Sequence, residues 1–344
     1  MIPGSYSFYD NKGGLDRQEW NQFVTNHASG NIFQTPEMYE LYSSQPGHTS
    51  YIVYCRSNSG ELVGLICASI LTGRTSISKF LTSRAIVTGG PLIKPGYEHI
   101  SEELLVYLIK RLPAHVIYLQ VRNIFSQAEI SSSFVKTGFT YEDHLNFLFD
   151  LKIGRGLLWE ALHPTRRKQI SRAERRNVTT CVHETPALTI ITDCYKILSA
   201  VYRRTKLPLA GIEYFIEAFG IWSEKGNLKI ITAKNETGII GFRFFFVFKE
   251  QIYDWYAGSD YQFNELYPND ILPWKIMEWG IENGCSIFDF GGAGNPDKEY
   301  GVRDYKEKFG GKQVNFGRYL YVRKPAIYRA GLVAVKVLRK LIRK

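Results

Sequence analysis

The sequence predicts a mixed α/β protein that contains two copies of one domain. Residues 51–70 and 228–248 share a pattern of strand, polar turn closed by glycine, and second strand, and they lie about half a chain apart. Each pattern is followed by a helix-like segment and then by an apolar strand. A chain of 344 residues with 44% hydrophobic residues is also large enough for two cores, because domains usually have about 150 residues.

The first predicted domain covers residues 1–150. Thr35 has the residue type of a helix N-cap, and Pro36 suits the first turn of the helix that would follow. The later elements are a hairpin, a helix, an apolar strand and a closing strand, at residues 51–70, 101–112, 116–121 and 138–151.

The second predicted domain covers residues 151–322. It opens with a strongly basic helix at residues 165–176, which is followed by a strand and a second helix. Chance similarity between two ordinary hairpins is the alternative to a duplication, and the matching order of the later elements argues against it. These later elements are a hairpin, a helix, an apolar strand and a closing strand, at residues 228–248, 271–283, 286–290 and 310–322.

The net charge of +10 is concentrated at the C-terminal end of the sequence. Residues 323–344 contain eight Lys or Arg residues and no acidic residue. Apolar residues recur at helical spacing from Tyr328 to Ile342, so we expect a basic amphipathic helix as a third segment. Such a helix can lie on the anionic inner face of a cell membrane, or its apolar side can pack on the first domain.

Composition disfavours several classes of protein. The five cysteines are scattered and lack the spacing of a metal site or of a disulfide framework, so we expect reduced thiols and no metal. No stretch reaches the roughly 18 apolar residues of a membrane-spanning helix, and the first residues lack the pattern of a secretory leader. We therefore expect a cytoplasmic protein that contacts a membrane only peripherally, at its inner face.

Polar and aromatic residues are densest between residues 253 and 311, in segments that follow predicted strands. Mixed α/β folds usually place their sites in such loops. The run GGAG at residues 291–294 lacks the G-x-G-x-x-G spacing, and no helix follows it directly, which disfavours a dinucleotide site. Its glycines suit a sharp turn beside a ligand or another chain segment.

Several motifs resemble those of one enzyme family. They are YDWYAGSD at residues 253–260, NDILPWKIMEWGIENGCSIFDFGG at 269–292, YGVRDYKEKFGG at 300–311, FQTPEMY at 33–39 and RRKQISRAERRNV at 166–178. In these motifs the chain resembles the Fem-type (FemABX) peptidoglycan bridge-forming aminoacyltransferases, whose fold is a tandem of two acetyltransferase-like (GNAT) domains. The resemblance extends over nearly the whole chain. It implies an enzyme that transfers an amino acid from aminoacyl-tRNA to an amine of a lipid-linked or nucleotide-linked peptidoglycan precursor.

The resemblance also implies catalytic residues. In the family, the lysine of an aromatic-lysine pair after a Gly-Val motif is held important for transfer, and here this lysine is Lys306. When an amine attacks an ester carbonyl, a fixed cation at about 3 Å stabilises the charge that develops on the carbonyl oxygen. Lys306 and Arg303 are the candidates for this donor, and Asp254 or Asp270 can accept the proton of the amine.

Further residues are expected to bind the substrates. The segment that contains Arg203 lies where the family often has basic residues near the phosphates of the acceptor, and arginine can grip a diphosphate through two parallel hydrogen bonds. The predicted substrate-binding residues are Tyr256, Asn269, Asp270, Tyr305, Arg203, Arg204 and Lys206.

These residues also have ordinary structural interpretations, which stay open at this point. Lys306 can be a solvated charge and Asp254 a strand-end residue that pairs with a neighbour. Asn269 and Asp270 can cap a helix, and the basic residues at 203–206 can interact with a helix dipole.

Two departures from the family bear on the donor. The second domain has only the short basic helix where some tRNA-dependent members carry a helical hairpin arm, and the Q/R-x-x-G-x-G/A loop that holds coenzyme A in ordinary acetyltransferases is absent after residues 252–254. We expect aminoacyl-tRNA as donor, no resident cofactor, and direct transfer, because no Ser-His-Asp order or reactive cysteine is visible. The alternatives are an acyl-coenzyme A-dependent N- or O-acyltransferase that modifies an envelope polysaccharide, and a non-catalytic nucleic-acid or membrane-binding module.

Overall fold

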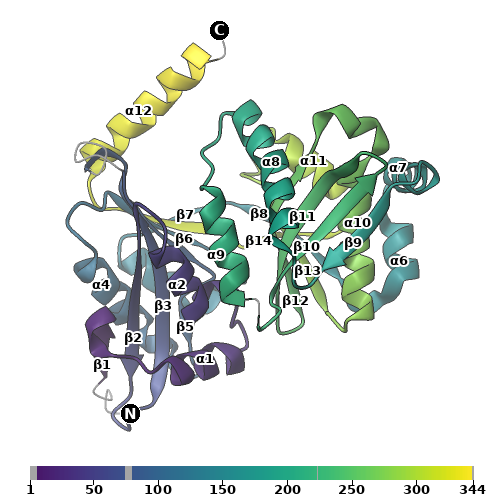
Figure 1. Cartoon of the computed structure of the whole chain (residues 1–344). Helices are drawn as coiled ribbons and strands as arrows, with labels where there is room; N and C mark the ends of the chain where they lie inside the picture. Colours follow the sequence, from purple (N-terminus) through teal and green to yellow (C-terminus); the bar gives the residue numbers. More distant parts are fainter. Residues whose placement is uncertain (1–5, 74–79, 223, 343–344) are drawn as a thin grey trace. The chain divides into compact units, whose positions relative to one another are not determined.

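The computed structural model describes residues 6–73, 80–222 and 224–342, and it divides the chain into two units (Figure 1). Residues 1–143 and 316–344 belong to the first unit, and residues 144–315 form the second. Each unit has a mixed sheet and a hydrophobic core of its own. This α/β architecture with two sheets confirms the predicted fold class.

An eight-stranded sheet forms the centre of the first unit, in the order β1-β2-β3-β4-β6-β15-β7, with β5 paired to β3. β4 and β6 are parallel and α4 connects them, as a parallel pair requires. The core lies between this sheet and the helices α4 and α5, while α2 packs against β2 and β3. The strands are β1 (Ser7–Asp10), β2 (His48–Arg56), β3 (Leu62–Leu71), β4 (Arg84–Thr88), β5 (Leu92–Ile93), β6 (Tyr118–Arg122), β7 (Thr140–Glu142) and β15 (Arg318–Val322). The helices are α1 (Arg17–Asn26), α2 (Pro36–Ser43), α4 (Ser101–Arg111), α5 (Ser131–Lys136) and α12 (Pro325–Ile342).

A seven-stranded sheet forms the centre of the second unit, in the order β14-β8-β13-β12-β11-β10-β9. The helices α6, α7 and α10 contribute buried residues to the core on one face, and α9 packs aromatic side chains against β11. The strands are β8 (Leu145–Asp150), β9 (Thr179–His183), β10 (Leu228–Asn235), β11 (Gly238–Phe248), β12 (Gln251–Ser259), β13 (Ile287–Gly292) and β14 (Lys312–Asn315). The helices are α6 (Gly154–Ala161), α7 (Pro164–Arg175), α8 (Leu188–Thr205), α9 (Ile212–Trp222), α10 (Pro268–Glu282) and α11 (Gly301–Glu307).

The two sheets repeat one strand order. The second sheet is read from β9 to β14 and the first from β1 to β7. In this direction the parallel pair β12 and β13 has the same position in the second sheet as the parallel pair β4 and β6 in the first. The hairpins predicted at residues 51–70 and 228–248 are β2 with β3 and β10 with β11. A helix, α4 or α10, connects the parallel strands in each unit. This equivalence is the structural basis of the duplication.

The closing strands differ from the prediction. β8 ends the first half of the sequence but pairs with β13 and β14 in the second sheet, whereas β15 ends the second half but pairs with β6 and β7 in the first. The two halves have exchanged these strands. The units therefore divide at residues 143/144 and 315/316 rather than at 150/151 and 322/323, and the C-terminal helix belongs to the first unit.

Local signals in the sequence correspond to observed helix starts. Thr35 caps α2 by accepting a hydrogen bond from the backbone N–H of Met38, and Pro36 occupies the first turn. The predicted basic helix is α7. Among the described residues, no helix is both long enough and apolar enough to cross a membrane.

Candidate functional site

The candidate site lies in the second unit, where the parallel pairing of β12 and β13 ends. Three residue pairs are in register, and the last of them is Tyr253 with Asp289. Directly after it, β12 has an irregularity against β11 between Asp254 and Tyr256. The equivalent pair in the first unit, β4 and β6, stays in register over five residue pairs. The second unit thus has a shorter parallel ladder, which ends beside an irregularity in β12.

The ammonium group of Lys306 occupies this region. Lys306 is on α11, is only 8% exposed, and donates hydrogen bonds to the carbonyl oxygen of Phe290 and, at 3.1 Å, to that of Gly292. Its Nζ also lies 5.0 Å from the centroid of the Phe290 ring. Burial lowers the pKa of Lys306 to about 8, because removal from water disfavours the charged form, and Asp254 opposes this shift. The lysine is therefore a fixed internal cation and not a solvated charge.

A buried ion pair lies beside this lysine. Arg243, on β11, donates from Nη1 to Oδ2 of Asp254 at 2.6 Å, and their side chains are 5% and 11% exposed. Arg243 Nη2 donates to the hydroxyl of Tyr305 at 3.1 Å, and that hydroxyl donates to the backbone oxygen of Asn269 at 2.5 Å. Asp254 Oδ1 and Arg243 Nε are buried and have no hydrogen-bond partner among the described residues. A buried acceptor without a partner is costly, so Asp254 Oδ1 is an unsatisfied oxygen inside the unit.

Asp289 is a second buried carboxylate at the site, and it is not among the residues that the motifs predict. Its Oδ1 accepts hydrogen bonds from the backbone N–H of Gly291 at 2.7 Å and from Asn146 Nδ2 at 2.9 Å. Burial raises the pKa of Asp289 to about 6, while the bond from Gly291 and the charge of Lys306 oppose the shift. Gly291 has a φ of 79°, which glycine adopts easily. Asp289 thus holds the turn whose carbonyl groups face Lys306.

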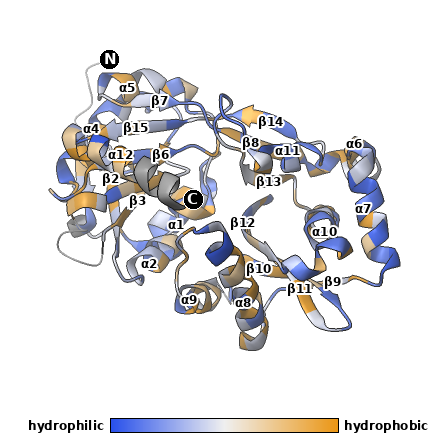
Figure 2. Cartoon of the chain, turned by 90° about the horizontal axis from the view of Figure 1, so that it is seen from above, coloured by the Kyte–Doolittle hydropathy of each residue, from blue (hydrophilic) through white to orange (hydrophobic). Residues whose placement is uncertain are grey.

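Asp270 and the basic helix α7 are tied together inside the unit. Arg166, the buried arginine of this helix, forms an ion pair with the Asp270 carboxylate. Its guanidinium also lies 4.6 Å from the ring centroid of Tyr305 and 5.1 Å from that of Phe309. The rest of α7 is largely hydrophilic, as the blue ribbon in Figure 2 shows. Arg166 therefore fixes α7 against the ring of Tyr305, the neighbour of Lys306, and the Asp270 carboxylate already has a cationic partner.

The other predicted residues have different surroundings. Arg303 donates to the backbone oxygens of Asn295, at 2.9 Å, and of Lys298, at 2.6 Å, so its guanidinium holds the loop before α11. Asn269 Nδ2 donates to Ser259 Oγ at 2.6 Å. These contacts do not direct either side chain to the ammonium of Lys306.

The basic residues near the end of α8 are exposed. Arg204 lies over the ring of Tyr261, at 5.1 Å from its centroid, while Arg203 and Lys206 are exposed at the same helix end. Tyr256 packs against Tyr202 of α8 and against Phe215 of α9, and burial raises the pKa of the Tyr256 hydroxyl. The structure therefore joins Asp254 and Tyr305 through Arg243, and the charge of Asp254 acts on the nearby ammonium of Lys306. Arg203, Arg204 and Lys206 are exposed at the end of α8.

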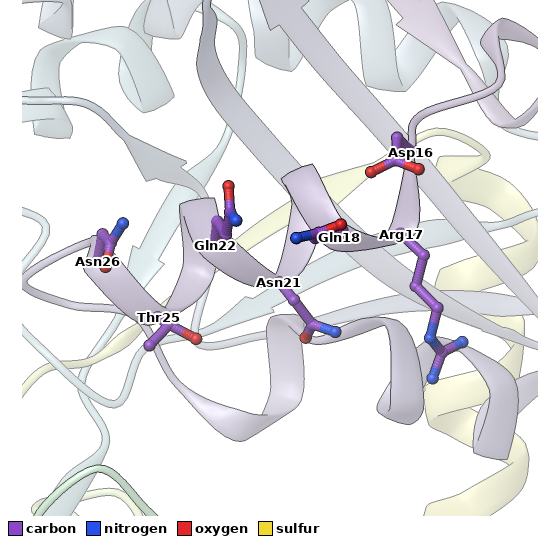
Figure 3. A pocket seen from close by; sticks show the side chains of 7 residues that line it. All are labelled: Asp16, Arg17, Gln18, Asn21, Gln22, Thr25 and Asn26. Atoms are coloured by element: carbon purple, nitrogen blue, oxygen red, sulfur yellow. The ribbon is translucent and has the colours of Figure 1, made fainter.

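A hollow of about 470 Å³ on the first unit contains none of these residues. Figure 3 shows that it is lined by Asp16 and by side chains of α1, which project from a single helix. Within the described part of the chain, no group of three or more His, Cys, Asp or Glu residues is arranged to hold a metal ion.

Comparison with known proteins finds one matching domain family. Residues 164–307 match the acetyltransferase (GNAT) domain family. The lipid II:glycine glycyltransferase of Staphylococcus aureus (strain USA300) is 30% identical over 102 residues, which are 26% of this chain and 24% of that protein. The chain thus matches about a quarter of the length of these curated relatives.

Similarity to solved structures extends over almost the whole chain. A crystal structure of FemX has a TM-score of 0.70 at 13% identity, with 94% of this chain and 99% of FemX covered. A tandem GNAT protein from the clavulanic acid biosynthesis pathway has a TM-score of 0.55 at 9% identity, with 92% and 98% covered. The fold, the GNAT match at residues 164–307 and the similarity to the glycyltransferase agree, and together they support a Fem-type member of the GNAT family.

Proposed function

We propose that the protein is an acyltransferase that forms an amide bond on a peptidoglycan precursor, with aminoacyl-tRNA as the donor. The observation that carries this proposal is the buried ammonium of Lys306, held by two backbone carbonyls beside Asp254. The relatives named lipid II:glycine glycyltransferase support the choice of reaction and acceptor. The proposal also includes contact with tRNA and peripheral contact of α12 with the inner face of the membrane.

The cluster suits direct attack of an amine on an ester. The neutral amine forms a bond to the carbonyl carbon, and negative charge moves to the carbonyl oxygen. An ammonium group has three N–H bonds, of which two bind the oxygens of Phe290 and Gly292, and we assign the third to this oxyanion. Asp254 Oδ1 accepts the proton that the amine loses. The bond between the carbonyl carbon and the tRNA oxygen then breaks, and the proton is passed on to that oxygen.

The donor assay separates this proposal from its main alternative. The match to a GNAT acetyltransferase domain favours the alternative, an acyl-coenzyme A-dependent transfer. The protein is incubated with a lipid-linked precursor and either a pool of charged tRNAs or acetyl-coenzyme A, and the precursor is analysed by mass spectrometry. We expect the mass of one or more amino-acid residues to be added with charged tRNA only. An acetylated product would support the alternative, and no product with either donor would support a non-catalytic binding role.

The pH dependence of the reaction tests the two buried charges. kcat/KM is expected to rise as the pH increases through about 6, because ionised Asp289 holds the Gly291 turn more firmly than the neutral acid does. It is expected to fall as the pH increases through about 8, where Lys306 loses its proton and its positive charge.

The Asp289→Asn variant keeps a side-chain oxygen for the Gly291 N–H and cannot ionise. We expect it to lose the rise near pH 6 and to keep the fall near pH 8. A profile that stays flat across both values in the unaltered protein would show that neither group controls the reaction.

A further inference from the structure

The first unit contains a groove of about 570 Å³ between α12 and the strands β4 and β6. Most of its lining is apolar, and large apolar side chains at its mouth, such as Leu81 and Leu332, are at least half exposed. Exposed apolar surface of this kind usually marks a binding site. Its lining includes Leu81, Arg84, Tyr118, Gln120, Gly331 and Leu332.

The sheet face beneath this groove carries several cations. Arg122 of β6 lies directly opposite Arg318 of β15, and Arg84 of β4 lies opposite Tyr118, so all three arginines share one face. The other face of β4 and β6 contributes small and branched apolar residues to the core. Like charges in directly opposed positions destabilise a sheet.

Few acidic groups offset these charges. Glu142 of β7 lies opposite Arg318, but no carboxylate among the described residues forms an ion pair with Arg84 or Arg122. Arg122 Nε donates to Gln120 Oε1 at 3.0 Å, and burial lowers the pKa of Arg122 because the charge is poorly hydrated.

A histidine on the same face adds an unpartnered polar group. His48 of β2 lies opposite Leu71 of β3, and Leu71 lies opposite Arg84. The Nδ1 atom of His48 is buried and has no hydrogen-bond partner in the described part of the chain. Burial and the charge of Arg84 both lower the pKa of His48. The cationic face therefore contains hydrogen-bonding groups that the protein itself leaves unused.

The groove and the cationic face are continuous, because Arg84, Tyr118 and Gln120 line the groove and Gln120 also binds Arg122. A simple anion would use the arginines and leave the apolar groove empty. A ligand that occupies both the cationic face and the apolar groove is an anionic amphiphile. Arginine binds its phosphate through paired hydrogen bonds, and the groove accepts its hydrocarbon chain. We propose that this site binds an anionic lipid, with the phosphate group on Arg84 and Arg122 and one hydrocarbon chain in the groove under α12. The proposal is independent of the reaction proposed for the second unit.

Farnesyl diphosphate is a suitable soluble probe, and isothermal titration calorimetry on the full chain measures its binding. We expect it to bind at least about tenfold more tightly than inorganic diphosphate, because only the former has a chain to bury. The Arg122→Gln variant is expected to weaken binding of both probes by about tenfold or more, since a charged hydrogen bond is lost.

Gly331→Phe tests the groove separately. Gly331 lines the groove, and a Cβ atom at this position meets no other atom within 4 Å, so the new ring can fill the space without disturbing the fold. We expect this variant to bind farnesyl diphosphate about tenfold more weakly and inorganic diphosphate as before. Lys110→Gln, an exposed residue of α4, is the matched control and should bind both probes normally.

Thermal unfolding checks that the variants are folded. Arg122→Gln removes one of two opposed charges, so its melting temperature should not fall. If it does fall, Arg84→Gln is used in its place. Equal affinities for farnesyl diphosphate and inorganic diphosphate would show that the groove does not bind the hydrocarbon chain. Normal binding of both probes by the folded arginine variant would show that the arginines do not bind the phosphate. Absence of binding to the unaltered protein would overturn the whole proposal.

Discussion

Replacing Lys306 with methionine should lower kcat by about 10²- to 10³-fold, which is the usual cost of losing one donor to an oxyanion. Methionine retains much of the length of the lysine side chain but has no N–H group. Because the ammonium is nearly buried and already lies against two carbonyl groups, no water molecule is expected to replace it with the same geometry. The rate of amide formation is measured with whichever donor the mass-spectrometric assay identifies.

Lys308 provides the matched control, because it lies two residues away at the exposed end of α11. Lys308→Met should leave kcat unchanged. Thermal unfolding of both variants separates loss of activity from loss of folding. A folded Lys306→Met protein with normal turnover would rule out the role assigned to this ammonium, although the fold and the family would be unaffected.

Local elements of the fold could be predicted because their signals are short-range. The Thr35 cap and the glycine-containing turns at residues 51–70 and 228–248 act over a few residues, and the structure confirms them. The exchange of β8 and β15 could not be predicted in this way. Which sheet a closing strand joins depends on contacts between segments far apart in the sequence, and both strands are short and largely apolar.

The candidate site was only partly predictable for a similar reason. Lys306, Asp254 and Tyr305 followed from the motifs, but Arg243, Asp289 and Arg166 were not selected as site residues. A usable signal did exist, since Arg243 and Asp289 each interrupt a strongly apolar strand. A charge in such a strand is buried and needs a partner, so each of these residues predicts an ion pair or a strong hydrogen bond. The sequence does not identify the partner, because Asp289 and its hydrogen-bond partner Asn146 are 143 residues apart in the sequence.

Replacing Asp254 with alanine should reduce the free energy of unfolding of the second unit by about 3 to 5 kcal/mol. The variant leaves the guanidinium of Arg243 buried without its carboxylate, and that guanidinium is only 5% exposed. The hydrogen bond to the Tyr305 hydroxyl would remain, but a neutral oxygen does not offset the charge. The loss of unfolding free energy should therefore exceed the loss from breaking an exposed ion pair. Asp193→Ala, which breaks the exposed pair with Lys196, is the control and should cost at most about 1 kcal/mol.

Urea unfolding followed by tryptophan fluorescence measures this effect, because five of the six tryptophans lie in the second unit. The double variant Arg243→Met, Asp254→Leu removes both charges and should regain most of the stability lost in Asp254→Ala, since an apolar pair can replace a buried ion pair at little cost. A double variant as unstable as the sum of two single variants would show that the two charges do not interact. In that case Asp254 would not be held by Arg243, and its free oxygen would have no fixed position from which to accept a proton.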